Sequence, residues 1–226
     1  MTRILIALLL SACVWGRAHA GEIRIVTSEP NAVVVEVSVS DLVRHSVLVN
    51  GQTLDRIDVG GWVHWYEPGA PSVPARGTAL GIPFGARAIV QVIDADYEEL
   101  QGIDLLPVAD TQWMGSEAYP VSREVYRKNP VIYGRDAFYP DEQAEITREG
   151  TMRDQRIALL SLRPIQYNPV RRILRVARRL RVRVQFVQGP NPTAYRSAGG
   201  SIAEGLDTFY EHSVLNASQA RPWRRR

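Results

Sequence analysis

Few residues of this chain have the type and spacing that catalysis requires. Nucleophilic catalysis needs a serine, threonine or cysteine beside a base, and the only cysteine, Cys13, lies near the N-terminus. The sequence contains no Gly-x-Ser-x-Gly elbow, no phosphate-binding loop and no Gly-x-Gly-x-x-Gly motif. An enzymatic hypothesis would rest on His45, His64 or the carboxylates, and it is the weakest of the three hypotheses considered below.

Metal and cofactor chemistry is not predicted either. The histidines lack the His-x-His and His-Glu-x-x-His spacings of zinc sites. The acidic group Asp94, Asp96, Glu98 and Glu99 offers oxygen ligands that suit calcium, but it lacks the spacing of an EF-hand loop and is more typical of a solvated strand end. No pair of carboxylates stands out as a candidate for glycoside hydrolysis. We therefore expect a protein without a cofactor that binds rather than catalyses.

The first twenty residues predict a secretory signal peptide. Arg3 provides a positive charge, residues 4–14 form an apolar run, and a small-x-small sequence ends at Ala20, directly before Gly21. We expect cleavage between Ala20 and Gly21 and export to the periplasm, the cell surface or the medium.

A lipoprotein is the alternative interpretation of this leader. Residues 10–13 (Leu-Ser-Ala-Cys) resemble a lipoprotein cleavage box, which would make Cys13 a lipidated N-terminus. No later apolar run approaches the ~20 residues of a transmembrane helix. Either way, no membrane span is expected.

The basic residues are almost all arginine and lie unevenly along the chain. Lys128 is the only lysine, and seven arginines fall within residues 171–183. Residues 163–226 carry 13 basic and 3 acidic residues, a net charge of +10, whereas residues 21–162 carry 12 basic and 21 acidic residues, a net charge of −9. We expect these two parts to neutralise one another by packing together, and we do not expect nucleic-acid binding.

Hydrophobic periodicity predicts an all-β fold. Short β-branched runs occupy residues 22–27, 32–40, 45–49 and 61–66, and Asn50-Gly51 is a strong signal for a two-residue hairpin turn. Residues 86–94 alternate in a way that suggests a largely buried strand. Residues 179–186 alternate between arginine or glutamine and large apolar side chains, which predicts a strand with one buried face and one solvated, arginine-bearing face.

These elements together predict a β-sandwich or flattened barrel of mostly antiparallel strands, with long Pro/Tyr-rich loops and a short C-terminal helix. The aromatic stretch from residue 105 to 140 is expected to wrap over the core. The β domain should occupy residues 21–190. A polar linker, a helix within residues 203–215 and a basic tail should make up residues 191–226.

Three stretches, in order, resemble the pro-domain of gingipain-type cysteine peptidases, which are secreted bacterial endopeptidases related to caspases. They are residues 68–86, with a Gly-x-Pro-x-x-Pro and an Ile-Pro-x-Gly-Ala element, residues 118–140, and residues 156–186, with the sequence Arg-Pro-Ile-Gln-Tyr-Asn-Pro. The resemblance covers nearly all of residues 22–226. The family-motif positions are Pro83, Gly85, Tyr119, Pro120, Tyr139, Pro140, Pro164, Tyr167, Asn168 and Pro169. Pro169 excludes a helical Asn168, so the tightest turn is expected there.

The resemblance implies an all-β, noncatalytic pro-domain that assists the folding of a cysteine peptidase and keeps it latent by covering its cleft. The partner would be the cognate catalytic domain, whose Cys/His dyad this chain lacks; a truncated precursor, a split gene and a free-standing inhibitor remain open. In arginine-specific members an arginine of the pro-domain can block the cleft. The candidates here are the loop basic residues Arg123, Arg127, Lys128, Arg135, Arg148 and Arg153.

The third hypothesis is a surface or adhesive β-domain. It would be anchored at Cys13 if the chain is a lipoprotein. The aromatic side chains around Trp62, Trp65 and Trp113 would then contact protein or carbohydrate.

Overall fold

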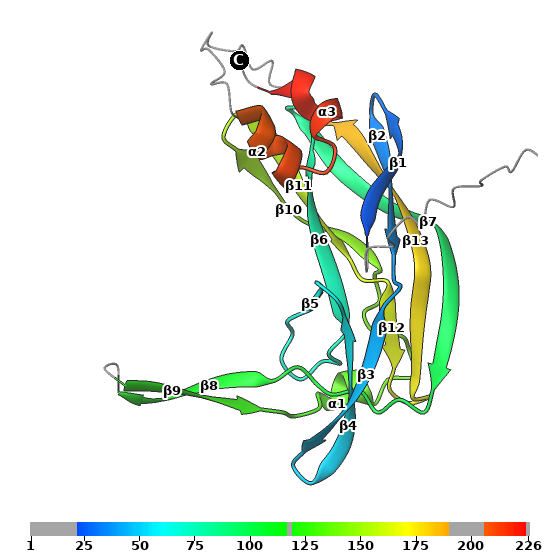
Figure 1. Ribbon diagram of the computed structural model, residues 1–226, viewed down its shortest axis with the longest axis vertical. Coiled ribbons are helices and arrows are strands. Elements are labelled where there is room, and N and C mark those ends of the chain that lie inside the picture. Colours follow the sequence, from blue (N-terminus) through cyan, green and yellow to red (C-terminus); the bar gives the residue numbers. More distant parts are fainter. Residues whose placement is uncertain (1–21, 117–118, 190–205, 225–226) are drawn as a thin grey trace, which may run out of the picture.

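The computed structural model describes residues 22–116, 119–189 and 206–224, which form two packed antiparallel sheets (Figure 1). The first sheet contains β1 (Ile23–Glu29), β2 (Ala32–Ser38), β7 (Ala86–Gln101), β12 (Ile165–Asn168) and β13 (Ile173–Gln188). The second contains β5 (Val63–His64), β6 (Pro74–Gly81), β10 (Ala144–Met152) and β11 (Gln155–Leu162). The predicted leader and its cleavage site at Ala20–Gly21 lie outside the described residues.

Two hairpins and three short helices complete the described chain. The hairpins are β3 (Leu42–Val49) with β4 (Gln52–Val59), and β8 (Asp110–Ser116) with β9 (Tyr119–Val125). The helices are α1 (Pro130–Tyr133), α2 (Leu206–Ser213) and α3 (Ala217–Ala220), with the 3₁₀ turn η1 (Arg221–Trp223). No helix in the described ranges is long and apolar enough to cross a membrane.

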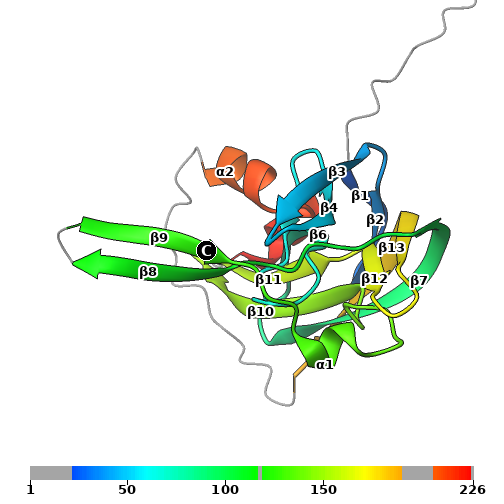
Figure 2. The same cartoon turned by 90° about the horizontal axis from the view of Figure 1, so that it is seen from below.

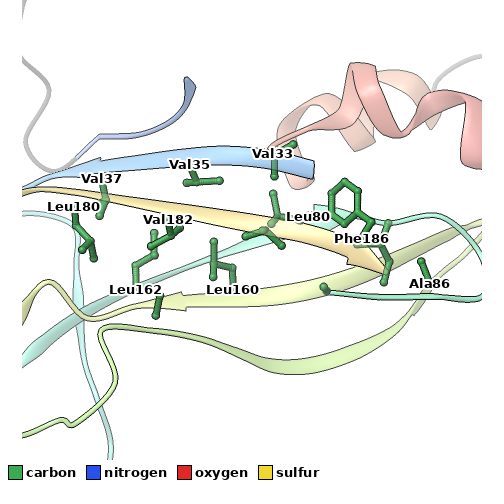
Figure 3. Packing of buried hydrophobic residues seen from close by; sticks show 14 of the residues in the cluster. Val33, Val35, Val37, Leu80, Ala86, Leu160, Leu162, Leu180, Val182 and Phe186 are labelled. Carbon is green, nitrogen blue, oxygen red and sulfur yellow. The ribbon is translucent and has the colours of Figure 1, made fainter. Parts of the chain in front are cut away.

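The main core fills the space between the two sheets (Figure 3). Alternate residues Leu180, Val182 and Val184 of β13 point into this space, where they meet Leu160 and Leu162 of β11. Burial of one such side chain contributes roughly 1.5–3 kcal/mol. The all-β prediction is confirmed as a sandwich. The flattened-barrel alternative is wrong, because the described sheets stay open at their edges.

The arginines on the outer face of β13 were expected to be solvated, but they are paired with carboxylates. These arginines form ion pairs with carboxylates of neighbouring strands: Arg183 with Glu29, Arg181 with Glu36, and Arg179 with Asp94 and Asp96. The expected neutralisation between the basic C-terminal part and the acidic N-terminal part is therefore observed as cross-strand pairing. The four acidic side chains on β7 are exposed and each is paired with an arginine of β13: Asp94 and Asp96 with Arg179, Glu98 with Arg178 and Glu99 with Arg175.

Strand β7 is much more exposed than its alternation predicted. Ala88 and Val90 pack against the core, but 55% of Ile89 is exposed and the strand is an edge of its sheet. The prediction of a largely buried strand is wrong because β7 pairs on one side only, with β13. Alternating apolar residues cannot distinguish a central strand from an edge strand that is half covered.

The hairpin and helix predictions are confirmed. Asn50 and Gly51 have φ values of 49° and 77°, as a type I′ turn between β3 and β4 requires. Helix α2 falls within the predicted 203–215 interval.

The C-terminal helical segment, residues 206–224, packs on one end of the sandwich. The side-chain amide of Asn216 bonds both backbone groups of Gly81, accepting from its N–H at 2.7 Å and donating to its carbonyl at 2.9 Å. Any side chain at Gly81 would collide with Ala220. A glycine on β6 therefore lets this segment approach the sheet.

Candidate functional site

A Ser-His-Asp series joins β4, β5 and the loop before β6. Ser72 Oγ lies 2.7 Å from His64 Nδ1, and His64 Nε2 lies 2.9 Å from Asp58 Oδ1. Burial opposes ionisation of Asp58, but hydrogen bonds from His64 and Arg56 outweigh it and lower the pKa of this carboxyl. His64 could be named as a candidate from the sequence, whereas Ser72 and Asp58 could not, because no local motif links the three.

One group that a catalytic serine commonly uses, its own backbone N–H, is already bonded in this series. Acyl transfer needs free N–H donors beside the nucleophile to stabilise an oxyanion, yet the backbone N–H of Ser72 donates to the carbonyl of Leu106 at 2.9 Å. Within the described ranges, no group of three or more His, Cys, Asp or Glu side chains is arranged to hold a metal. The observed bonds instead connect three segments that are separate in the sequence.

We expect the substitution His64→Ala to lower the free energy of unfolding by about 1–3 kcal/mol, because it leaves Ser72 and Asp58 without a shared partner. His45 is the control: its Nε2 lies 3.6 Å from Asp58 and its side chain is 54% exposed, so His45→Ala should change the value by less than about 0.5 kcal/mol. Urea unfolding measures both. Equal effects of the two substitutions would contradict the linking role of His64.

Three of the ten family-motif positions, Tyr139, Pro140 and Tyr167, form one structural joint. Tyr167 is buried, and its hydroxyl donates to the carbonyl of Ile103 at 2.9 Å. Tyr139 pairs with Tyr167 through two backbone hydrogen bonds, of 2.9 and 2.7 Å, and its own hydroxyl donates to Glu67 at 2.6 Å. The Pro140 carbonyl accepts from the amide of Gln166 at 2.8 Å. These residues hold the loop before β10 against β12.

The polar groups of the β12–β13 connection form hydrogen bonds, as expected for a tight turn at this motif. Asn168 is buried, donates to Asp136 at 2.8 Å and accepts from the N–H of Arg171 at 3.0 Å. The carbonyl of Pro164 accepts from Ala177, and Pro169 follows directly after the end of β12. The turn expected at this corner is present, and it fixes where β13 begins.

The remaining motif positions lie in other parts of the fold. Gly85 has a φ of 78°, and the N–H of Ala86 donates to the carbonyl of Pro83 across this turn. Tyr119 and Pro120 lie on β9, opposite Ser116 and Gly115. The motif positions are thus distributed over several separate parts of the fold.

The β8–β9 hairpin, residues 110–125, projects from the sandwich as an arm (Figures 1 and 2). We call it the β8–β9 arm. The aromatic stretch of residues 105–140 was expected to wrap over the core, and for this part the prediction is wrong. Its residues 105–108 are buried, but Trp113, Met114 and Val121 on the arm are 71%, 48% and 58% exposed. Exposed apolar side chains on a projecting element are typical of a surface that binds a partner.

The register of the arm places its side chains on two faces. Directly opposite pairs share a face: Met114 lies opposite Val121, and Gln112 lies opposite Arg123 on the same side. Trp113 lies on the other side, opposite Ser122. The outer edge of each strand is unpaired within the described sheets.

The three tryptophans proposed as a contact patch are not brought together. Trp62 packs against the core, and the Arg163 guanidinium lies 4.7 Å from the ring centre of Trp65. Only Trp113 is prominently exposed. The structure therefore does not form the aromatic patch that the adhesive hypothesis required.

Three of the six candidate basic residues are already engaged. Lys128 forms an ion pair with Asp104 at 2.5 Å and lies 5.1 Å from the Tyr133 ring centre. Arg135 pairs with Asp141 at 3.3 Å, and the Arg153 guanidinium lies 5.4 Å from the ring centre of Phe209. The side chains of the other three form no ion pair, hydrogen bond or ring contact with a described residue: Arg123, Arg127 and Arg148.

Among the described residues, the arginines whose side chains have no ion pair, hydrogen bond or ring contact lie on two surfaces, except Arg172 in the β12–β13 turn. Most described arginines bind a carboxylate: Arg24, Arg44, Arg56, Arg135, Arg156, Arg163, Arg171, Arg175, Arg178, Arg179, Arg181, Arg183, Arg221 and Arg224. Arg123 lies on the β8–β9 arm and Arg127 at its base, whereas Arg87 and Arg148 line a groove between β7 and β10. These two surfaces carry positive charge that the described chain leaves uncompensated.

Comparison with models of known protein families shows to which family this chain belongs. The family model Propeptide_C25 matches residues 14–202, which is most of the chain. The chain belongs to the Propeptide_C25 family. The resemblance to gingipain-type pro-domains is thereby confirmed, and the family assignment is that of a noncatalytic domain.

Similar proteins of Porphyromonas gingivalis agree with membership of Propeptide_C25. Lys-gingipain HG66 is 26% identical over 171 residues, which cover 73% of this chain and 10% of that protein. Gingipain R1 is 26% identical over 165 residues, which cover 70% of this chain and 15% of that protein. The chain thus spans about a tenth to a seventh of the length of these relatives.

Solved structures share the fold of this Propeptide_C25 chain. The complex of P. gingivalis RgpB pro- and mature domains matches with a TM-score of 0.71 and 21% identity, over 86% of this chain and 97% of that one. A structure on the zymogenic latency of gingipain K from P. gingivalis matches with a TM-score of 0.58 and 24% identity, over 75% of this chain and 94% of that one.

Proposed function

We propose that this chain is a noncatalytic pro-domain that binds a gingipain-type cysteine peptidase domain and holds it latent. Its membership of the Propeptide_C25 family is the observation that carries the proposal. The solved structures that share its fold are a complex of pro- and mature domains and a study of zymogenic latency, which agrees with it. Assistance in folding the peptidase belongs to the same proposal.

The β8–β9 arm is the element best suited to enter a partner. Both of its strands have an open edge, and extended segments bind clefts by pairing with exposed strands. Its apolar side chains Trp113, Met114 and Val121 are available for burial in an interface. Interface energy is concentrated in a few such side chains, tryptophan and arginine above all.

We propose that Arg123 or Arg127 blocks the substrate cleft of the peptidase. Both are exposed and lack an intramolecular partner among the described residues, whereas Lys128, Arg135 and Arg153 are held by Asp104, Asp141 and Phe209. A side chain that enters a pocket must first leave any partner that holds it. Arg148 lies away from the arm, on β10, and is assigned a different role below.

Charge removal on the arm tests this role. We expect Arg123→Ala or Arg127→Ala to weaken inhibition of the cognate peptidase domain by roughly 30-fold or more, as for an interface hot spot. Arg172→Ala is the matched control, since Arg172 is also exposed and without a described side-chain partner but lies in the β12–β13 turn. The measurement is the inhibition constant against a peptide substrate. Unchanged constants for both arm variants would contradict the role of the arm.

Export remains part of the proposal. We propose that the chain is secreted after cleavage between Ala20 and Gly21, because residues 1–20 have the pattern of a signal peptide. N-terminal sequencing of the exported protein should begin at Gly21. A lipid-modified N-terminus at Cys13 would instead support the lipoprotein alternative.

A further inference from the structure

A groove runs between the edges of the two sheets, away from the β8–β9 arm. It lies where the start of β7 and the end of β13 approach the middle of β10, and it has a volume of about 710 Å³. Its walls include Arg87 and Ile89 of β7, Val187 of β13 and Arg148 of β10. We call it the β7–β10 groove.

Both strands beside this groove have an open edge. Within the described sheets, β7 pairs only with β13, and β10 pairs only with β11. The N–H of Ala88 donates to the carboxylate of Glu149 on β10 at 2.7 Å, so this amide points away from β13 and toward β10. Because backbone groups alternate in direction along a strand, the amide and carbonyl of Val90 point to the same open side. Apart from the ladder with β13, neither the amide nor the carbonyl of Val90 forms a backbone hydrogen bond with a described residue.

The groove carries two positive charges that no carboxylate of the described residues neutralises. The side chains of Arg87 and Arg148 form no ion pair with a described residue. The nearest carboxylate, Glu149, is already bound on both oxygens, by the Ala88 N–H and by Arg156 at 2.8 Å. Most arginines of the described chain bind a carboxylate. The two arginines in this groove do not, so they are available to bind an external anion.

The groove also offers apolar surface beside these charges. Ile89 is 55% exposed and Val187 is 39% exposed, and Arg87 lies opposite Val187 on β13. Ile146 and Ala88 at the base of the groove pack against the core. A ligand that fits must therefore have both carboxylates and apolar side chains.

We propose that the β7–β10 groove binds an extended polypeptide segment that carries both carboxylates and apolar side chains on one face, at every second residue, added as a strand to the edge of β7. The backbone of the segment pairs with the open groups at Val90, its apolar side chains cover Ile89 and Val187, and its carboxylates bind Arg87 and Arg148. This site is separate from the arm, so it does not depend on the latency proposed above. A nucleic acid fits less well, because the described lining has no aromatic ring for base stacking.

A labelled model peptide tests this proposal on the full chain. The probe is fluorescein-labelled Thr-Glu-Thr-Val-Thr-Glu-Thr, which places both glutamates and the valine on one face of a strand, and fluorescence anisotropy measures its dissociation constant. We expect saturable binding that weakens about tenfold or more in the double variant Arg87→Glu, Arg148→Glu, since like charges then face the peptide. Arg172→Glu is the matched control, since Arg172 is exposed in the β12–β13 turn, and this variant should bind the peptide as the wild type does.

Altered peptides separate charge from strand pairing. Replacing both glutamates by lysine should abolish binding, and replacing the central valine by proline, which removes a backbone N–H, should weaken it. Wild-type affinity of the double variant, or equal binding of the lysine peptide, would overturn the proposal. So would binding of a fluorescent single-stranded oligonucleotide at the same arginines with no binding of the glutamate peptide. Circular dichroism of the double variant checks that it remains folded.

Discussion

Replacing Arg24 and Arg181 together by methionine is expected to lower the free energy of unfolding by roughly 3–5 kcal/mol. Both arginines bind the carboxylate of Glu36, at 2.5 and 2.6 Å, and only 2% of Glu36 is exposed. Methionine keeps most of the apolar stem of arginine but removes its charge. The double variant therefore leaves a buried carboxylate without a counter-charge, which is the costly way to break a buried pair.

The pH dependence of this variant gives a second readout. Burial raises the pKa of Glu36, but the hydrogen bonds and charges of Arg24 and Arg181 outweigh it, so the folded-state pKa lies below the usual value. The stabilisation is thus fully present above the unfolded pKa of about 4.3 and is lost as pH falls through the lower, folded pKa. Without the arginines, burial dominates and Glu36 takes up a proton at higher pH. We expect the stability difference between wild type and variant to shrink as the pH falls below about 4.

Guanidinium unfolding at several pH values measures both effects. Glu36→Gln is the control: it removes the charge but leaves a polar group of similar size, so it should cost less than the double arginine variant. The two arginines stay partly hydrated, since their side chains are 61% and 31% exposed. A loss below about 1 kcal/mol in the double variant, the usual worth of an exposed ion pair, would show that Glu36 is not effectively buried.

Tyr167→Ala is expected to destabilise the fold by roughly 3–5 kcal/mol. Tyr167 is 1% exposed in the second core cluster, where it packs with Ile103, Leu105 and Leu174. Its removal creates a cavity and also leaves the carbonyl of Ile103 without its donor. The joint between the loop before β10 and β12 should loosen with it.

Two further variants divide this effect into its parts. Tyr167→Phe removes only the hydroxyl and should cost about 1–3 kcal/mol, the penalty for an unsatisfied buried acceptor. Tyr66→Ala is the surface control, since Tyr66 is 66% exposed, and should change stability by less than about 0.5 kcal/mol. Thermal unfolding compares the three variants. A Tyr167→Ala variant as stable as Tyr66→Ala would contradict the structural role of this motif position.

The fold class could be predicted from the sequence because side-chain alternation and turn signals involve residues that are neighbours in the chain. Period-2 alternation placed Leu180, Val182 and Val184 on one face of β13, and the Asn50-Gly51 pair identified the β3–β4 turn. Both depend on residues that are neighbours in the sequence. The charge division between the two parts of the chain was also informative, since it anticipated that the arginines of β13 would meet carboxylates of other strands.

Sequence pattern could not show which strands lie at an edge or which segments project. The alternation of β7 suits a buried strand as well as an edge strand, and only its single neighbour β13 decides between them. The β8–β9 arm has the aromatic composition of a core segment, but its apolar side chains lie on a hairpin that no other strand covers. Placement of this kind depends on long-range packing.

The candidate site was predicted only in part for the same reason. Six basic residues were equivalent in the sequence, and the structure separates them by their partners: Lys128, Arg135 and Arg153 are held, whereas Arg123, Arg127 and Arg148 are not. The groove residue Arg87 was missed, because nothing in residues 86–94 shows that its neighbours would leave its charge unpaired.

The most direct test of the central claim is an activity titration. The purified full chain is added in increasing amounts to its cognate gingipain-type peptidase domain while hydrolysis of a peptide substrate is followed. We predict that activity falls to a low residual level as the molar ratio approaches one, and that it returns when the chain is degraded by proteolysis. Full activity of the peptidase in a large molar excess of the correctly folded chain would contradict the proposed function.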